Sequence, residues 1–277
     1  MKMMLSIITI NYNNCDGLQK TIDSVVNQTW RDFEWIVIDG GSTDGSRELI
    51  EKYQDHFAYW CSEPDNGIYN AMNKGIAKAK GEYLNFMNSG DGFYEKDTLE
   101  KIFSTERKAD ILYGDWMQVY NDHTHLMHFP DPVEIYTFLH RNICQQAMFV
   151  RTTIMKEKGF DESFKIIADY CRWVELVQQG VVFEFVHLII CLYDMNGISS
   201  VRSSEDSIEK ERMLRNKIPK AVSISLDRLD QYERDWTVIY LKRLLSTGGI
   251  VSFLTQLFLK LLHKLFVNEL HVPNSSV

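Results

Sequence analysis

Residues 83–92 read Tyr83-Leu84-Asn85-Phe86-Met87-Asn88-Ser89-Gly90-Asp91-Gly92, an apolar run that stops in small residues and one carboxylate. A run of this composition, bounded by Gly81 and Gly90, is typical of a buried strand that feeds a tight loop. In an open α/β sheet, ligands bind beyond the carboxyl ends of the strands. The pattern therefore predicts Asp91 at the mouth of a crevice, where a carboxylate suits Mg²⁺ or Mn²⁺. An ordinary turn is the alternative, since Asn, Ser, Gly and Asp are common loop formers.

The segments before this run alternate between apolar strands and helices with one apolar face. We expect strands at residues 5–10, 33–38 and 57–61. We expect helices at residues 16–27 and 68–79, and a third helix that follows Gly45 and runs through Tyr53. Strands that alternate with helices favour a layered α/β sheet whose neighbouring strands run parallel.

A glycine-rich turn follows the second expected strand, from Asp39 to Gly45. It matches neither the P-loop pattern nor the dinucleotide fingerprint. Asp39 could accept hydrogen bonds from a base or a ribose, while Gly40 and Gly41 let a flat ring approach the backbone. The alternative is purely local, with Ser42 or Thr43 capping the next helix.

Composition narrows the class of protein. The chain has 277 residues, of which 45% are hydrophobic, and this is enough for one substantial core plus an appendage. A net charge of −8 argues against nucleic acid as the main partner. The five cysteines are scattered, and no signal-peptide pattern opens the sequence, so we expect a cytoplasmic protein with reduced thiols.

Five ordered motifs in the first hundred residues resemble family-2 glycosyltransferases of the GT-A fold. The motifs are Ser6-Ile-Ile-Thr-Ile-Asn-Tyr-Asn13, Ser24-Val-Val-Asn-Gln-Thr29, Glu34-Trp-Ile-Val-Ile-Asp-Gly-Gly-Ser-Thr-Asp-Gly45, Ser62-Glu-Pro-Asp-Asn-Gly-Ile-Tyr-Asn-Ala-Met-Asn-Lys-Gly75 and Asn88-Ser-Gly-Asp91. Within the family, the pattern is most similar to glycosyltransferases of the colanic-acid and capsular polysaccharide type. The resemblance implies the GT-A fold, a mostly parallel central sheet flanked by helices.

The resemblance also implies roles for six residues near a nucleotide-sugar donor. Tyr12 would stack on the base, Asp39 would bind the base or ribose, and Asp91 would hold a divalent cation, Mn or Mg, against the pyrophosphate. The remaining members would line the nucleotide pocket or meet its negative charge: Asp65, Asn73 and Lys74. This chain departs from the family's acidic motif, because Ser89 and Gly90 stand at its earlier positions.

The second half is expected to supply the acceptor side. Residues 167–173 open a helix, and Asp169 matches the family position of the catalytic base. In an inverting transfer the base acts across the sugar from the metal, which fits a residue far from Asp91 in the sequence. The alternative is a carboxylate placed at a helix start by the helix dipole.

Residues 1–203 are expected to form the glycosyltransferase domain and residues 204–277 a C-terminal helical extension. Within the extension, residues 249–267 show a broad apolar face interrupted by polar positions. Four basic residues against one acidic residue from Lys242 onward would favour a peripheral contact with an anionic membrane. Packing on the catalytic domain or pairing in a homodimer is the alternative.

Together these features predict an inverting glycosyltransferase that moves a sugar from a nucleoside-diphosphate-sugar donor to a glycan or lipid-linked acceptor. The setting would be surface polysaccharide biosynthesis, at the inner face of the cell membrane. A nucleotide-sugar-binding domain without transfer activity is the alternative, because the acidic motif is reduced to Asp91.

Overall fold

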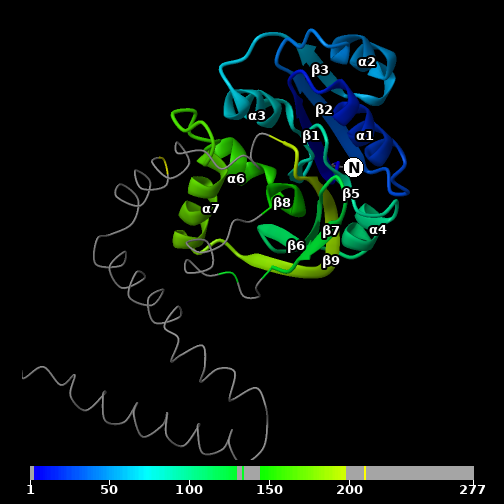
Figure 1. Cartoon of the computed structure of the whole chain (residues 1–277). Coiled ribbons are helices and arrows are strands. Elements are labelled where there is room, and N and C mark those ends of the chain that lie inside the picture. Colours follow the sequence, from blue (N-terminus) through cyan, green and yellow to red (C-terminus); the bar gives the residue numbers. More distant parts are fainter. Residues whose placement is uncertain (1–2, 130–132, 134–143, 198–208, 210–277) are drawn as a thin grey trace, which may run out of the picture. The chain divides into compact units, whose positions relative to one another are not determined.

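The structure of the protein is a computed structural model that describes residues 3–129, 133, 144–197 and 209 (Figure 1). The chain divides into two units, Met1–Met213 and Leu214–Val277, and every described residue belongs to the first unit. The predicted boundary at residue 203 and the apolar-faced segment 249–267 lie outside the described residues. Among the helices of the described part, none is long and apolar enough to cross a membrane.

The first half of the sheet is parallel. Four strands pair side by side in the order β3-β2-β1-β4: β1 (Leu5–Asn11), β2 (Phe33–Asp39), β3 (Tyr59–Ser62) and β4 (Tyr83–Phe86). The helices that connect them are α1 (Cys15–Val26), α2 (Ser46–Lys52) and α3 (Ile68–Lys78). The predicted α/β alternation of this half is confirmed, with each boundary within about two residues of its expected place.

The second half of the sheet is mixed. After β4 come β5 (Gly92–Phe93), α4 (Thr98–Phe103), β6 (Ile111–Val119), β7 (Thr124–Met127), β8 (Met148–Arg151), α6 (Thr152–Glu157), α7 (Ala168–Gln178) and β9 (Phe183–Asp194). The sheet continues from β4 through β8, β6 and β9 to β5, and β7 pairs with β6. β8 is antiparallel to both of its neighbours, whereas β9 is parallel to β6 and antiparallel to β5. The expected parallel order thus holds for the first half, and the second half is mixed.

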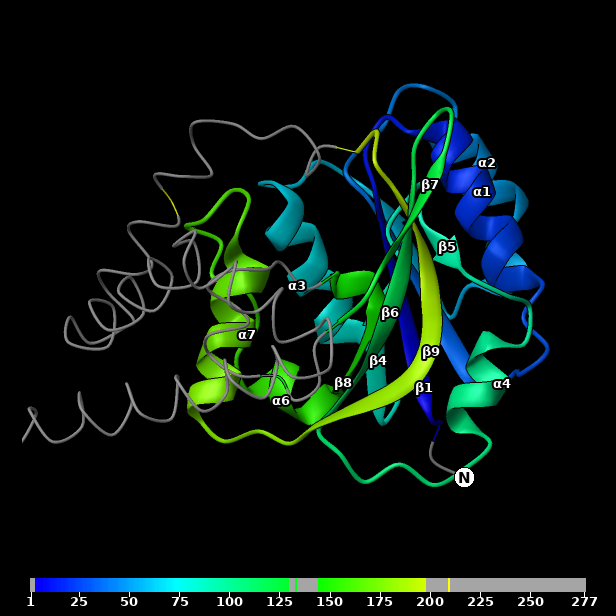
Figure 2. The same cartoon turned by 60° about the horizontal axis from the view of Figure 1, so that its bottom comes forward.

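Helices cover both faces of this sheet. Figure 2 shows α1, α2 and α4 on one face, with α3, α6 and α7 on the other. The central strands β1 and β2 are therefore buried on both faces: Ile7, Ile8 and residues 36–38 have no exposed surface, and the polar residues Ser6, Thr9 and Glu34 are buried as well. This double burial explains why apolar residues stand next to one another in the motif-bearing strands.

The register of the parallel strands brings their polar last residues into one row. Asn11 at the end of β1 pairs with Asp39 at the end of β2, and Asp39 pairs with Ser62 at the end of β3. The loops that follow these strands meet at the same edge, where an open α/β sheet binds its ligands.

Candidate active site

Asp39 is the centre of the polar row at the carboxyl edge. Its Oδ1 accepts hydrogen bonds from Asn11 Nδ2 (2.8 Å) and Ser42 Oγ (2.5 Å). Its Oδ2 accepts from the Ser42 backbone N–H (2.9 Å) and from Ser62 Oγ (2.6 Å). Burial by itself raises the pKa of a carboxyl group, but the bonds from Ser42, Ser62 and Asn11 lower the pKa of Asp39 below its ordinary value. In this conformation both oxygens of Asp39 hold the loop, so a direct bond to a nucleotide requires one of these donors to turn away.

Tyr12, Gly40 and Asp65 come together beside that row. A Cβ at Gly40 would lie 2.6 Å from Asp65 Oδ2 and 3.1 Å from a ring carbon of Tyr12, so only glycine leaves room for both side chains. The Tyr12 ring is 62% exposed, which is unusual for a large aromatic side chain at the edge of a core. An exposed ring beside a bare backbone and a half-buried carboxylate is suited to a flat heterocycle with N–H donors.

Asn73 and Lys74 lie on α3 and have protein partners. The Asn73 side-chain Oδ1 accepts the Phe160 backbone N–H (2.9 Å), and its Nδ2 donates to the Phe160 carbonyl oxygen (2.9 Å) and to Glu162 Oε1 (2.8 Å). Lys74 Nζ pairs with Glu63 Oε1 at 2.8 Å, a contact that raises the lysine pKa. Asn73 therefore ties α3 to the loop before α7, and Lys74 lies close to Pro64 and the Asp65 loop.

The loop at residues 88–91 is hydrogen-bonded to α1. The buried Thr21 hydroxyl lies 3.0 Å from the Asn88 carbonyl oxygen, 2.6 Å from the Asp91 carbonyl oxygen and 3.1 Å from the Gly90 N–H. Gly90 has a φ of +105°, which side-chain-bearing residues rarely adopt. The glycine thus permits a turn that sets the position of Asp91.

Asp91 is almost completely buried, with 5% of its surface exposed. Its Oδ2 accepts from Gln146 Nε2 (2.6 Å), and its Oδ1 accepts from the Asp194 backbone N–H (2.9 Å). Burial raises the pKa of Asp91 to about 7 against the lowering effect of these bonds, and the negative charge of Asp194 raises it further. Asp194 Oδ2 would lie 3.4 Å from a Cβ at Gly90, so its carboxylate faces the same loop. Lys20 Nζ lies 4.0 Å from Asp194 Oδ2 and is a partial counter-ion for this pair of carboxylates.

Asp169 lies in the first turn of α7, as expected. Tyr69 Oη on α3 is hydrogen-bonded to Asp169 Oδ1 at 2.8 Å and also to the Ile166 carbonyl oxygen. A residue of the first-half motifs thus contacts the predicted base one hundred positions later in the sequence. The structure brings Tyr12, Asp39 and Asp65 into one cluster, while Asp91 and Asp169 belong to two further contact networks.

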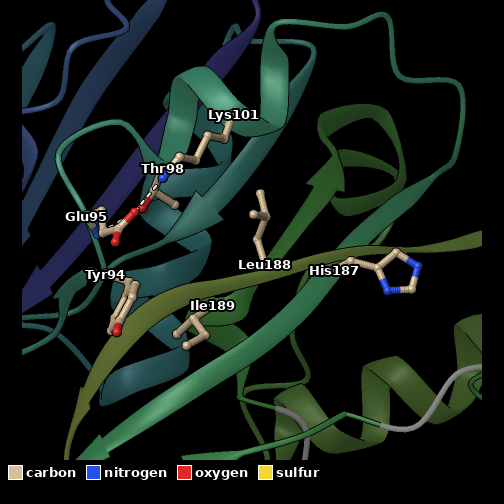
Figure 3. Close-up of a pocket in the computed structure, with 7 residues that line it drawn as sticks. All are labelled: Tyr94, Glu95, Thr98, Lys101, His187, Leu188 and Ile189. Atoms are coloured by element: carbon tan, nitrogen blue, oxygen red, sulfur yellow. Dashed lines mark hydrogen bonds and ion pairs between the residues drawn. The ribbon is translucent and has the colours of Figure 1, made fainter.

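A surface pocket is lined by residues that follow Asp91 in the sequence, beginning with Tyr94, and by residues of β9. Figure 3 shows it between the segment around α4 and strand β9. Its volume is about 170 Å³. Its lining contains none of the predicted site residues: Tyr94, Glu95, Thr98, Lys101, His187, Leu188 and Ile189. This volume is below the ~300 Å³ at which ligand pockets usually begin, so the pocket is not a candidate donor site.

The sequence matches the family described as Glycosyl transferase family 2 over residues 6–165. The chain belongs to this family. It is 36% identical over 209 residues to a glycosyltransferase of Mycobacterium tuberculosis (strain CDC 1551 / Oshkosh), a match that covers 72% of this chain and 78% of the relative. It is also 26% identical over 217 residues to a PGL/p-HBAD biosynthesis glycosyltransferase of Mycobacterium bovis (strain BCG / Pasteur 1173P2), covering 75% and 83% of the two chains.

Solved structures share the fold of this glycosyltransferase. S. aureus TarS 1-349 in complex with UDP-GlcNAc superposes with a TM-score of 0.65 at 18% identity, covering 84% of this chain and 73% of that one. The mannosyltransferase PcManGT from Pyrobaculum calidifontis, in complex with GDP-Man and Mn²⁺, gives a TM-score of 0.58 at 14% identity, covering 93% and 79%. The predicted GT-A fold is thereby confirmed.

Four residues of this glycosyltransferase enter the site without having been singled out from the sequence. They are Thr21, Tyr69, Gln146 and Asp194. Tyr69 stood inside a recognised motif and Gln146 in a glutamine pair, so each had a local signal. Asp194 had none, because its place beside Asp91 depends on β9 lying next to β5 in the sheet.

Proposed function

We propose that this family member is an inverting glycosyltransferase. It transfers a sugar from a nucleoside diphosphate donor to a glycan or lipid-linked acceptor during synthesis of a surface polysaccharide or glycolipid. The observation that carries this proposal is the 2.8 Å contact between Tyr69 and Asp169. Tyr69 belongs to a motif of the first half of the chain, which is expected to bind the donor, and Asp169 belongs to the second half, which is expected to bind the acceptor. A base that acts on an acceptor hydroxyl is needed on the acceptor side.

The donor half is proposed to bind the nucleotide. Tyr12 stacks on the base, and Asp65 with the Gly40 backbone borders the same face. Asp39 either bonds the base or ribose directly or holds the loop that does so, since its four donors keep Gly40 and Ser42 in place. Relatives in fold support this class of ligand, because TarS is seen with UDP-GlcNAc and PcManGT with GDP-Man.

Asp91 is proposed to hold the divalent cation, with Asp194 beside it. The fit rests on the chemistry of the residues: both offer hard oxygen ligands, and a cation would stabilise the ionised form of Asp91, which burial and, to a smaller extent, the charge of Asp194 disfavour. Across the described residues, no group of three or more His, Cys, Asp or Glu side chains could hold a metal ion by itself. Donor phosphates and water would therefore complete the coordination. When bound, such a cation offsets charge on the leaving diphosphate.

Asp169 is proposed as the base. Its carboxylate takes the proton of the acceptor hydroxyl while that oxygen attacks the anomeric carbon and the bond to the diphosphate breaks. A single displacement of this kind inverts the anomeric configuration. The setting in glycolipid or polysaccharide synthesis is supported by the M. bovis relative, whose name places it in PGL/p-HBAD biosynthesis.

The alternative, a nucleotide-sugar-binding domain without transfer, is favoured by the single Asp91 in the acidic motif. A donor panel separates the two proposals: UDP- and GDP-sugars are incubated with the full chain and Mn²⁺ while nucleoside diphosphate release is measured. Catalytic release of diphosphate from one donor supports the transferase. If a donor raises the melting temperature of the protein but is never turned over, even with candidate acceptors present, the protein is a nucleotide-sugar-binding domain without transfer activity.

A further inference from the structure

Tyr69 contacts the proposed base but has no step of its own in the proposed mechanism. It is 5% exposed on α3, and its ring packs on Phe160 with 5.5 Å between ring centroids. Its hydroxyl lies within hydrogen-bonding distance of two oxygens, Asp169 Oδ1 at 2.8 Å and the Ile166 carbonyl oxygen. The packing of the ring fixes where this hydroxyl lies.

Two contacts between oxygens require two hydrogens if both are to be hydrogen bonds, and a phenol supplies one. When Asp169 is ionised, the Tyr69 O–H can point to the carboxylate. When Asp169 carries a proton, its own O–H can donate to Tyr69 Oη, and the phenol hydrogen turns to the Ile166 carbonyl. The same hydroxyl can therefore form a hydrogen bond with Asp169 Oδ1 in both protonation states.

The partners of this hydroxyl are themselves held. Glu209 accepts the backbone N–H groups of Lys165 (2.6 Å), Ile166 (3.0 Å) and Ile167 (3.4 Å), and this fixes the segment that presents the Ile166 carbonyl. Burial and the negative charge of Asp169 both raise the pKa of Tyr69 far above its ordinary value. Tyr69 thus stays a neutral hydroxyl that redirects its hydrogen and does not lose it.

We propose that Tyr69 is a positioning residue for the base, donating to ionised Asp169 before transfer and accepting from it afterwards. The inference rests on the proposed function of Asp169. During transfer the acceptor O–H bond breaks and the Asp169 O–H bond forms. The acceptor oxygen bonds to the anomeric carbon, and the electron pair of the old bond leaves on the diphosphate. Tyr69 changes only the acceptor to which it donates.

Other charged and titratable groups lie near this end of α7. Glu209 holds the preceding backbone, and Glu162 reaches Asn70 and Asn73 on α3. Further along the helix, Arg172 and Lys158 both approach Glu175, and burial raises the pKa of Tyr170. Removing the Tyr69 hydroxyl leaves these groups in place, so a change in the pH profile would report on Tyr69.

The test compares Tyr69→Phe with Tyr83→Phe in the full chain. Tyr83 is also buried and donates to a backbone carbonyl, that of Ala109 at 2.6 Å, but it contacts no site residue named above. We expect Tyr69→Phe to lower kcat about tenfold or more, a share of the effect of general-base catalysis. Donor Kd should stay within about twofold of the wild type by thermal shift, and Tyr83→Phe should keep both values.

The pH profile adds a readout that a purely structural role would not move. Losing the hydroxyl removes a charge-assisted bond from ionised Asp169 and a weaker one from the protonated form, so the pKa of Asp169 rises. The acid limb of kcat against pH should therefore shift to higher pH in Tyr69→Phe alone.

An Asp169→Asn variant that still transfers sugar would refute the proposed base. An inactive Asp169→Asn beside a Tyr69→Phe with wild-type kcat and pH profile would refute only the role of Tyr69. Loss of folding or of donor binding in Tyr69→Phe would make the residue structural and would also overturn the inference.

Discussion

The two halves of the sheet place their polar residues by different means. In the parallel half, Asn11, Asp39 and Ser62 meet because three adjacent strands end in register. In the mixed half, Gln146 and Asp194 reach Asp91 from 55 and 103 residues away, through antiparallel pairs and a late strand. The first half is thus organised by neighbouring motifs and the second by distant contacts.

The pKa values of the two buried aspartates, Asp39 and Asp91, differ between these two halves. Asp39 receives bonds from three side chains near the strand ends, and its pKa falls below the ordinary value. Asp91 receives two donors, but burial and, to a smaller extent, the charge of Asp194 raise its pKa to about 7. The first carboxylate is satisfied by the protein alone, while the second is suited to a ligand that brings positive charge.

The largest effect should come from the mixed half. Asp169→Asn should lower kcat about 100- to 10,000-fold, the usual contribution of general-base catalysis, because the amide cannot take the acceptor proton. Donor Kd, measured by calorimetry, should stay unchanged, because Asp169 acts on the acceptor. An equal loss of donor affinity would place Asp169 in the nucleotide pocket, and the two halves would then not bind donor and acceptor separately.

A smaller effect is expected where the halves meet. Asp91→Asn should weaken donor binding in the presence of Mn²⁺ about 100-fold, because several kcal/mol of charge neutralisation are lost with the cation. The wild type should melt at a higher temperature with Mn²⁺ and donor than with EDTA, and the variant should not. Asp194→Asn is the companion variant, since it removes the neighbouring charge but keeps the backbone N–H that bonds Asp91. An Asp91→Asn protein with an undiminished Mn²⁺ response would exclude Asp91 as the ligand.

The pH dependence of stability should distinguish the same two aspartates. Asp91 has a folded pKa of about 7, above its unfolded value near 4, so the native state binds more protons between these values. Stability should therefore fall as the pH rises from about 4 to 7, by an amount on the order of a few kcal/mol. Melting curves in EDTA at pH 5 and pH 8 should show this fall in the wild type and a smaller one in Asp91→Asn.

Asp39→Asn is the control for that experiment. The lowered pKa of Asp39 means that its stabilising contribution is present above its unfolded value near 4 and is lost as the pH falls through the folded value. Asp39 is ionised at both pH 5 and pH 8, so the variant should lose the same stability at each. A loss confined to pH 8 would contradict the assignment.

The smallest effect belongs to the parallel half. Tyr12→Ala should weaken binding of the nucleoside diphosphate by about 1 kcal/mol, the lower end of the usual contribution of one stacked base. Tyr12→Phe should retain nearly all affinity, because the exposed ring and not the hydroxyl makes the contact. Fluorescence titration with UDP and GDP measures both variants, and equal binding by all three proteins would show that the base lies elsewhere.

The sequence by itself determined the parallel half and its motifs. Continuous apolar strands that end in Asn11, Asp39 and the 88–91 loop predict their own burial and a common edge, because parallel strands place their carboxyl ends together. The burial of each strand and the place of its last residue need only the strand itself, whereas the roles expected for Tyr12 and Asp65 came from the resemblance to the family motifs.

Only the tertiary structure decided which residues complete the site. The expected roles of Asp91 and Asp169 came from motif positions, but their partners Gln146, Asp194 and Tyr69 come from other elements. β9 ends beside Asp91 because it pairs antiparallel with β5 and parallel with β6, and no short-range pattern encodes this arrangement. Tyr69 reaches Asp169 because α3 and α7 cover the same face of the sheet (Figure 2). Local patterns specify strands and loops, whereas the charge around a buried carboxylate depends on what the whole fold places beside it.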